Sequence, residues 1–219
     1  MSDTTGHNFG KDYWEKHWDD AHRAHESGES APNPSVITET AGLTPGTALD
    51  AGCGTGAEAT WLAGHGWRVV GADISATALE RAAARAVQAS VSDRVTWLEA
   101  DLTTWEPSDR FDLVVTNYAH PSIPQLAFYE RIATWVAPGG TLVIVGPLTE
   151  PTPERSGHAH GHDDAEHPPA EATVTLADIS AVLDPSDWRI DNAEELTRVA
   201  PGRSTGVLRD AVVRATRGR

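Results

Sequence analysis

The segment that most constrains the fold is a glycine-rich turn at residues 49–56, which reads Leu-Asp-Ala-Gly-Cys-Gly-Thr-Gly. It begins inside a short apolar run at residues 48–51 and leads into a helical pattern at residues 58–64. Glycines at such a turn let the backbone bend tightly and approach a ligand, and the first N–H groups of the next helix remain free to bind it. The turn therefore predicts a strand–loop–helix unit that binds a nucleoside.

The rest of the chain alternates short apolar segments with helical ones, which is typical of βαβ units in a mainly parallel sheet. We expect strands at residues 48–51, 68–72, 95–99, 111–116 and 141–145, and helices at residues 35–41, 58–64, 77–89, 124–136 and 176–183. One face of the helix at 77–89 carries Leu79, Ala82, Ala83, Ala86 and Val87. Two last strands, 188–196 and 207–216, flank a short turn at 201–206 and should pair antiparallel. The predicted class is α/β.

Composition limits the partners. The chain has 219 residues, one cysteine and a formal net charge of -15. This length fits a single α/β domain, and the negative field disfavours nucleic acid and favours a small-molecule substrate. Neither a signal peptide nor a membrane-spanning run is evident, so we expect a cytoplasmic protein without a membrane partner. The sequence leaves the oligomeric state open.

Two flanking segments differ from the core pattern. Residues 1–34 predict a helix and a loop that cover the cofactor site, and residues 35–219 form the single catalytic domain. On that helix, Trp14, Trp18 and His22 share one face, which is equally typical of plain packing. A flap at residues 149–170 carries His158, His160, His162 and His167, which could bind a divalent metal, could cover the substrate site or could be a solvated loop.

Asp50 helps to choose between two cofactors. The glycines also satisfy a relaxed dinucleotide pattern, Gly52-x-Gly54-x-x-Ala57. A carboxylate directly before them would repel a pyrophosphate but would suit the cationic amino group of S-adenosylmethionine. Asp50 could instead cap the turn. Its charge favours the sulfonium cofactor.

Two further acids end predicted strands. Asp73 lies 17 residues after Gly56, where a carboxylate can bind both ribose hydroxyls of either cofactor. As an alternative it could cap the next helix, although Ser75 is better suited to that role. Asp101, with Leu102, follows the third strand and could bind the edge of adenine, or it could be a solvated loop residue.

Taken together, the chain resembles the class I S-adenosylmethionine-dependent methyltransferases, of the small stand-alone type related to tellurite-resistance and thiopurine methyltransferases. The matching segments are residues 49–56, 70–75 (Val-Gly-Ala-Asp-Ile-Ser), 99–102 (Glu-Ala-Asp-Leu), 111–115 (Phe-Asp-Leu-Val-Val) and 138–142 (Pro-Gly-Gly-Thr-Leu). The resemblance implies a Rossmann-like, doubly wound, seven-stranded sheet whose last strand is antiparallel and lies beside the fifth.

The resemblance also implies residue roles. Asp50 would lie at the methionine end of the cofactor with the turn residues Gly52, Cys53, Gly54 and Gly56. Asp73 would hold the ribose, Ile74 would pack on the adenine, and Asp101 with Leu102 would bind the adenine edge. Thr116 and Asn117 would face the methyl group, and the aromatic helix with Trp14 and Trp18 would close over the site.

Methyl transfer requires alignment of the acceptor more than a strong catalytic acid. If the acceptor arrives protonated, His120 or Tyr118, at the end of the fourth strand, could take the proton, although either could be an ordinary loop residue. The expected function is methyl transfer to a small molecule. An NAD(P)-dependent oxidoreductase and a non-catalytic protein that binds S-adenosylmethionine or metal are the alternatives.

Overall fold

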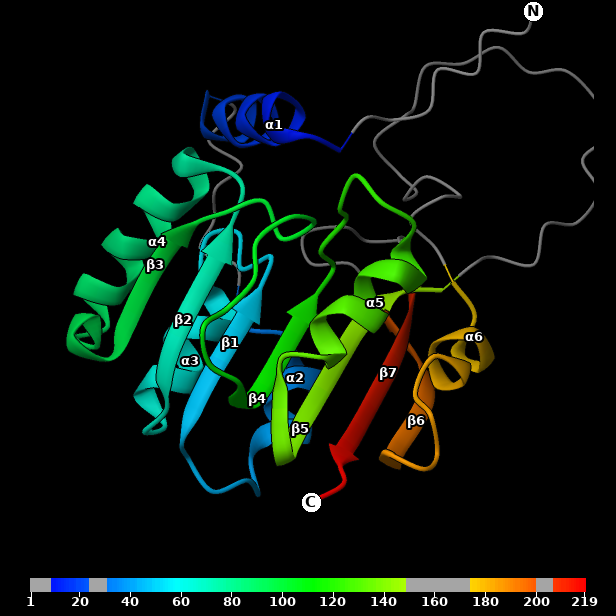
Figure 1. Ribbon diagram of the computed structural model, residues 1–219. Helices are drawn as coiled ribbons and strands as arrows, with labels where there is room; N and C mark the ends of the chain where they lie inside the picture. Colours follow the sequence, from blue (N-terminus) through cyan, green and yellow to red (C-terminus); the bar gives the residue numbers. More distant parts are fainter. Residues whose placement is uncertain (1–8, 24–30, 149–173, 200–206) are drawn as a thin grey trace, which may run out of the picture.

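The computed structural model describes residues 9–23, 31–148, 174–199 and 207–219 (Figure 1). Its centre is a seven-stranded sheet with the order β3-β2-β1-β4-β5-β7-β6. The strands are β1 (Thr47–Ala51), β2 (Arg68–Asp73), β3 (Val95–Glu99), β4 (Phe111–Asn117), β5 (Val136–Pro147), β6 (Trp188–Val199) and β7 (Val207–Arg217). The first five pair in parallel, and β7 pairs antiparallel with both β5 and β6. The predicted class, the seven strands and the position of the last strand beside the fifth are confirmed.

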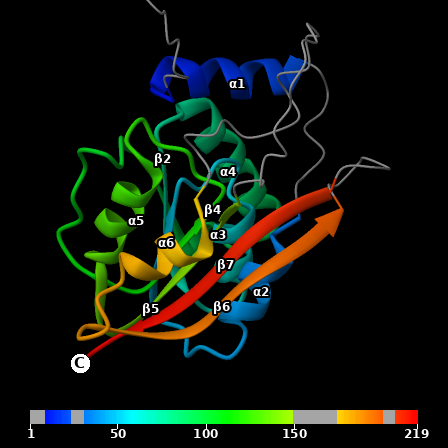
Figure 2. The same cartoon turned by 90° about the vertical axis from the view of Figure 1, so that its right-hand side faces the viewer.

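Helices cover both faces of the sheet, and one helix lies across the carboxyl ends of its parallel strands (Figures 1 and 2). The helices are α1 (Lys11–Arg23), α2 (Pro34–Thr40), α3 (Ala57–Gly64), α4 (Ala76–Gln88), α5 (Gln125–Ala133) and α6 (Leu176–Ala181), with a 3-10 turn, η1 (Ser92–Arg94). Successive side chains of a strand point to opposite faces. Accordingly, Leu113 and Val115 pack on the side of α2, α3 and α4, and Val114 packs on the side of α5 and α6. In Figures 1 and 2, α1 lies across the carboxyl ends of the parallel strands.

Two sequence predictions were wrong in detail. The helix predicted at residues 124–136 ends at Ala133, and Val136 instead begins β5, where it pairs with Phe111. The chain leaves the helix there because it joins the sheet beside β4, where the N–H of Phe111 donates to the carbonyl oxygen of Trp135 at 2.9 Å. On α4, Leu79, Ala82 and Ala86 are buried but Val87 is 67% exposed, since it lies about 100° around the helix from Ala86.

Two further predictions, the flap at 149–170 and the turn at 201–206, lie entirely outside the described residues. Within the described ranges, no helix is both long and apolar enough to cross a membrane.

Candidate functional site

The glycine-rich turn folds over the carboxyl end of β2. The backbone N–H groups of Gly52 and Cys53 both donate to the carbonyl oxygen of Ala72, at 2.9 and 3.0 Å. Gly52, Gly54 and Gly56 all have positive φ, at 78°, 49° and 73°. Such left-handed conformations cost little only for glycine. The sequence pattern therefore reflects a backbone shape that other residues would strain.

Asp73 links this turn to the helix that follows β2. Its Oδ2 accepts from the N–H of Gly54 at 2.8 Å, and its Oδ1 accepts from the N–H of Ser75 at 2.9 Å. Ser75 is the N-cap of α4, because its Oγ accepts from Ala78 N at 3.2 Å. Burial raises the pKa of Asp73 above its ordinary value, against the effect of these hydrogen bonds. A nearly buried carboxylate thus lies at the position where the sequence predicted a ribose contact.

Two more carboxylates lie at the same edge of the sheet. Asp50 is 1% exposed, and its Oδ2 accepts from Ala59 N at 3.0 Å. Glu58, at the start of α3, accepts through Oε1 from Asn33 N at 2.9 Å and from Asn117 Nδ2 at 3.0 Å. This edge of the sheet therefore holds three buried acids.

Burial is the main cause of raised pKa values in this group of carboxylates. The pKa of Asp50 is raised well above its ordinary value by burial and then by the charges of Glu58 and Asp73. The pKa of Glu58 is also raised by burial, although hydrogen bonds and the charge of Arg85 oppose the change. Clustered acids of this kind favour a cationic ligand and would repel a pyrophosphate.

Glu58 was not recognised from the sequence because it falls inside a predicted helix, where acids are usually solvated. One signal was available. It is an acid in the first turn of a helix that is otherwise almost entirely apolar, Ala-Glu-Ala-Thr-Trp-Leu-Ala, directly after the glycines.

The residues predicted to bind adenine follow β2 and β3. Asp101 Oδ1 accepts from the N–H and the hydroxyl of Thr103, at 2.9 and 2.6 Å. Leu102 is buried, and its carbonyl oxygen accepts from Arg131 Nε at 2.8 Å. Ile74 is half-buried. Asp101 therefore shapes the local turn, and the contact of these residues with adenine stays a prediction.

The two residues predicted to face the methyl group have partners within the protein. Thr116 is buried and donates its hydroxyl to the carbonyl oxygen of Ala51 at 2.9 Å, which ties β4 to β1. Asn117, one residue later, accepts through Oδ1 from Asn33 Nδ2 at 3.0 Å and donates to Glu58. Of the two, only Asn117 has its polar group beside the carboxylate cluster.

His120 lies among aromatic rings on the loop after β4. Its ring centroid is 5.9 Å from that of Phe9 and 6.5 Å from that of Trp14, and the Trp14 ring is nearly parallel to it. Trp14 Nε1 also donates to the carbonyl oxygen of His120 at 3.2 Å. Burial lowers the pKa of His120, and its buried Nδ1 has no hydrogen-bond partner among the described residues. The lowered pKa favours the neutral imidazole, in which the unpartnered Nδ1 could accept a proton.

Tyr118 is less suited to act as a base. Its hydroxyl donates to Asp210, and burial together with this hydrogen bond raises the pKa of the phenol. A phenol in this state keeps its proton. Between the two sequence candidates, the geometry favours His120.

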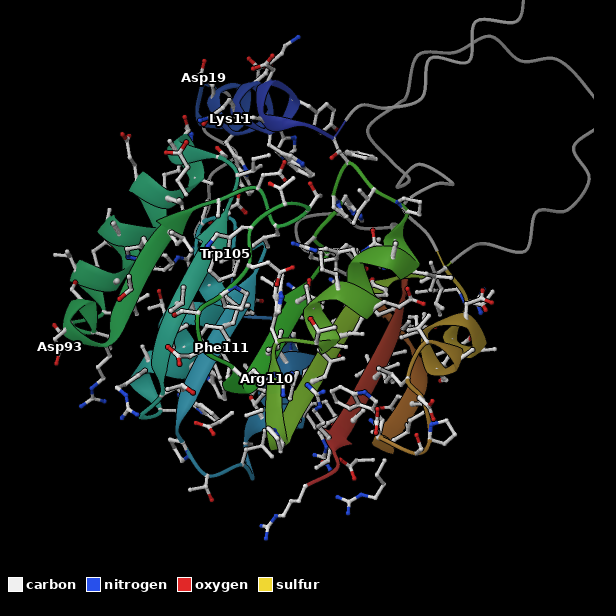
Figure 3. The ribbon with its side chains drawn as sticks, in the orientation of Figure 1. Lys11, Asp19, Asp93, Trp105, Arg110 and Phe111 are labelled. Carbon is white, nitrogen blue, oxygen red and sulfur yellow. The ribbon has the colours of Figure 1, made fainter. Side chains whose placement is uncertain are left out.

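Helix α1 contacts the glycine-rich turn, the start of α4 and the end of β3. A Cβ added at Gly54 would lie 3.1 Å from Cζ2 of Trp18. Glu15 accepts from Ala76 N at 2.8 Å, Ser75 Oγ at 3.0 Å and Thr77 N at 3.3 Å, so it caps α4 in addition to Ser75. Lys11 (Figure 3) pairs with Glu99 at the end of β3. Polar and aromatic contacts thus hold α1 over the glycine turn.

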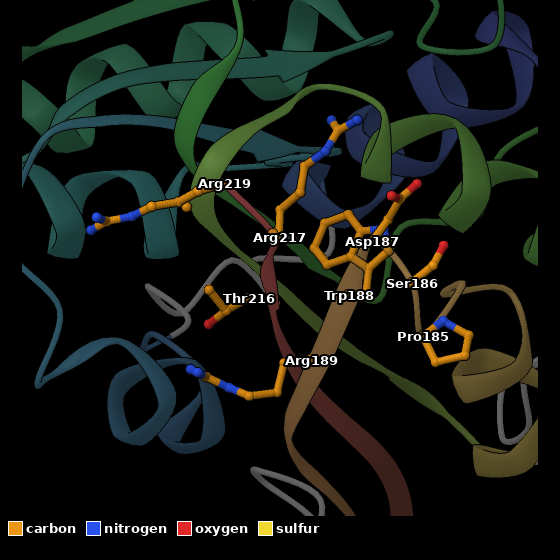
Figure 4. Close-up of a pocket in the computed structure, with 10 residues that line it drawn as sticks. Pro185, Ser186, Asp187, Trp188, Arg189, Thr216, Arg217 and Arg219 are labelled. Carbon is orange, nitrogen blue, oxygen red and sulfur yellow. The ribbon is translucent and has the colours of Figure 1, made fainter.

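A hollow of about 470 Å³ lies elsewhere, at the amino edge of the parallel strands, between the start of β6 and the end of β7 (Figure 4). The guanidinium groups of Arg189, Arg217 and Arg219 lie apart from one another there (Figure 4). Arg189 pairs with Asp191 at 2.7 Å, and Arg217 Nη1 donates to the carbonyl oxygen of Val136 at 2.8 Å. Because these cations do not converge on one point, we assign no chemistry to this hollow.

Two further predictions from the sequence concern the single cysteine and a cluster of histidines. Cys53 is buried, and burial raises the pKa of its thiol well above the ordinary value, which fits a packing residue. His158, His160, His162 and His167 lie outside the described residues. In the part of the chain that is described, no group of three or more His, Cys, Asp or Glu side chains could hold a metal ion.

Comparisons with known proteins find methyltransferases that are similar to this chain. Residues 48–140 match the family model for a methyltransferase domain. The chain is 34% identical over 149 residues to the probable thiol methyltransferase 2 of Arabidopsis thaliana, covering 66% of this chain and 64% of that protein. It is 30% identical over 141 residues to the thiocyanate methyltransferase 1 of Brassica oleracea, covering 63% and 62%. The match therefore spans less than two thirds of the length of these relatives.

Among solved structures, the magnesium protoporphyrin IX methyltransferase of Synechocystis PCC 6803 with bound SAM has the same fold. The TM-score is 0.64 at 21% sequence identity, covering 95% of both chains.

Proposed function

We propose that this chain, which carries a class I methyltransferase domain, binds S-adenosylmethionine at the carboxyl edge of its sheet and transfers the methyl group to a small thiol. One observation carries the proposal: three buried carboxylates, Asp50, Glu58 and Asp73, surround a turn of glycines with positive φ. Such a site favours a cation that carries hydroxyl groups. The same acids argue against a nicotinamide dinucleotide, because its pyrophosphate would face like charges.

The residues present fit the parts of this cofactor. Asp50 and Glu58 would lie near its positive groups, and Asp73 would accept from the ribose hydroxyls. Asp101 and Leu102 would hold the adenine edge. When bound, S-adenosylmethionine supplies an electrophilic methyl group on a sulfonium that is a good leaving group.

The protein's own contribution would be alignment, exclusion of water and removal of one proton. Trp14 and Trp18 on α1 would cover the site. His120 would take the thiol proton onto its unpartnered Nδ1 while the acceptor sulfur gains the methyl group, and would then release that proton to water. Only modest basicity is needed, because a free thiol has a pKa of about 8.5.

Two observations favour a thiol over other small acceptors. Sulfur makes favourable contacts with aromatic rings, and the His120 ring lies among those of Phe9, Trp14 and Tyr118. In addition, the relative from Arabidopsis thaliana is named a probable thiol methyltransferase.

Calorimetry and an acceptor panel test the proposal on the full chain. S-adenosylmethionine and S-adenosylhomocysteine should bind, NAD should not, and D50A should lose binding while keeping its circular dichroism spectrum. Thiols should release S-adenosylhomocysteine faster than matched alcohols and carboxylic acids. Failure to bind either sulfur nucleoside would disprove the cofactor assignment. Binding with equal or faster turnover of the oxygen acceptors would disprove the thiol assignment alone.

A further inference from the structure

The loop that carries His120 begins with an unusual backbone conformation. Tyr118, the first residue after β4, has a φ of 56°, and Ser90 is the only other non-glycine residue with positive φ in the described ranges. A left-handed conformation costs a tyrosine roughly 1–2 kcal/mol, so surrounding contacts must maintain it. One such contact is the hydrogen bond from Tyr118 N to the carbonyl oxygen of Val145, at 2.9 Å.

The other contacts come from the C-terminal hairpin of β6 and β7. The Tyr118 hydroxyl donates to Oδ1 of Asp210, which is 0% exposed. Arg198 Nε donates to Oδ2 of the same carboxylate at 2.6 Å. The Arg198 guanidinium also lies 5.4 Å from the centroid of the Tyr118 ring. A buried carboxylate with one donor on each oxygen fixes the positions of both donors.

The conformation of Tyr118 determines where the next two residues lie. Ala119 packs so closely on the glycine-rich turn that a Cβ added at Gly52 would overlap the Cβ of Ala119. His120 then places its ring beside Phe9 and Trp14. A continuous series of contacts therefore runs from Arg198 and Asp210, through Tyr118 and Ala119, to Gly52.

We propose that Asp210 and Arg198 are positioning residues that act through Tyr118 to hold His120 and the acceptor side of the site against the glycine-rich turn. The inference rests on the proposed function, because it assigns the hairpin a part in methyl transfer. Neither residue touches the carboxylates predicted to hold the cofactor. Their loss should therefore affect acceptor turnover much more than cofactor binding.

A purely structural ion pair would behave differently. Its removal would lower the free energy of unfolding but leave the remaining folded enzyme with unchanged kinetics. The exposed pair of Arg209 Nη2 and Glu195 Oε2, at 2.7 Å on the same hairpin, is such a case and supplies the control variant R209Q. Y118F and D210N are the test variants, and both keep nearly the same shape. Y118F removes the hydroxyl donor, whereas D210N removes the charge and leaves one acceptor oxygen for two donors.

The kinetic test compares Y118F, D210N and R209Q with the unmodified chain well below their unfolding temperatures. In Y118F and D210N, kcat for the thiol should fall about 10- to 100-fold, while the Kd for S-adenosylmethionine stays within about threefold. R209Q should match the unmodified chain in both. Unchanged kcat in the two test variants, or an equal loss in R209Q, would overturn the inference.

A second readout does not need catalysis. The His120 imidazole can be followed by NMR as the pH is changed, with H120N used to assign its signal. Burial lowers the pKa of His120. Loosening of the loop in Y118F or D210N should therefore raise this pKa toward the ordinary value of about 6.5, and R209Q should not. An unchanged pKa in both variants would overturn the inference even if the chain proved to have another activity.

Discussion

The indole ring of Trp18 lies against the backbone of Gly54, so that a Cβ added to this glycine would sit 3.1 Å from the ring atom Cζ2. Gly54 also has a φ of 49° and donates its N–H to Asp73 at 2.8 Å. The first helix and the first βα turn, which are separated by α2 and β1, therefore fit together at one residue.

The substitution G54A should destabilise the protein for two separable reasons. The left-handed backbone alone should cost about 1–2 kcal/mol, and contact with Trp18 should add to it. In a W18A background only the backbone cost remains, so G54A should be less destabilising there. Urea unfolding of the four proteins measures the difference as a double-mutant cycle. Additive effects would mean that Trp18 does not contact Gly54 in solution.

The three buried acids should make the stability of the cofactor-free protein depend on pH. The pKa values of Asp50, Glu58 and Asp73 are raised, chiefly by burial. The unfolded chain therefore loses these protons first, beginning near pH 4, and stability falls as pH rises through the folded pKa values. D50N should reduce this fall and also weaken binding of S-adenosylmethionine. Unfolding at about pH 4 and about pH 8, with calorimetry, measures both effects.

The exposed carboxylate of Asp93 supplies the control for that experiment, since D93N removes an acid far from the glycine turn. It should leave both the pH dependence and the cofactor affinity unchanged. The same acids predict that cofactor binding releases protons, so the calorimetric enthalpy should change with the ionisation enthalpy of the buffer. Buffer-independent enthalpies, or a D50N variant with the original pH dependence, would contradict the assigned role of this cluster.

E15Q should loosen α1 without unfolding the domain. Partial burial favours a higher pKa for Glu15, but the hydrogen bonds from Thr77, Ala76 and Ser75 outweigh it, and the pKa is lowered. Glu15 therefore stabilises the docked helix above its ordinary pKa of about 4.3, and this contribution is lost as pH falls through the lowered value. Because the group is largely solvated, E15Q should cost only about 0.3–1 kcal/mol.

Hydrogen exchange of the α1 amides measures this effect. At neutral pH the amides should exchange faster in E15Q than in the unmodified chain. D12N, which changes an exposed acid in the first turn of the same helix, is the matched control. Equal protection in E15Q and the unmodified chain would show that Glu15 does not hold the helix.

H120A should slow the methylation of protonated thiols by about 10²- to 10⁴-fold, the usual range for loss of a general base. Burial lowers the pKa of His120, so activity should hold below the ordinary histidine value and decline only as pH falls through the lowered pKa. H120A should lack that decline. Steady-state rates across pH measure it, with H65A, at the exposed residue that caps the C-terminus of α3, as the control. An unchanged profile in H120A would remove His120 from the mechanism.

Local sequence patterns predicted much of the fold. The alternation of apolar and helical segments predicted all seven strands and the antiparallel hairpin, because hydrophobic periodicity reflects which face each element buries. The predictions were wrong where two periodicities met. At residues 134–136 the apolar residues of α5 are followed at once by those of β5, so the end of the helix was placed too late. On α4 the apolar face is wider than the face that is buried, so the apolar residue Val87 is exposed.

The sequence by itself determined the glycine turn and the acids at the ends of the strands, since the backbone shape and the charge there depend on neighbouring residues. Only the tertiary structure decided which distant groups join them. Glu58 meets Asn117 across 59 positions, and Tyr118 meets Asp210 across 92. Such pairs form because the sheet order places β1 beside β4 and β7 beside β5, and that order is set by the packing of the whole chain.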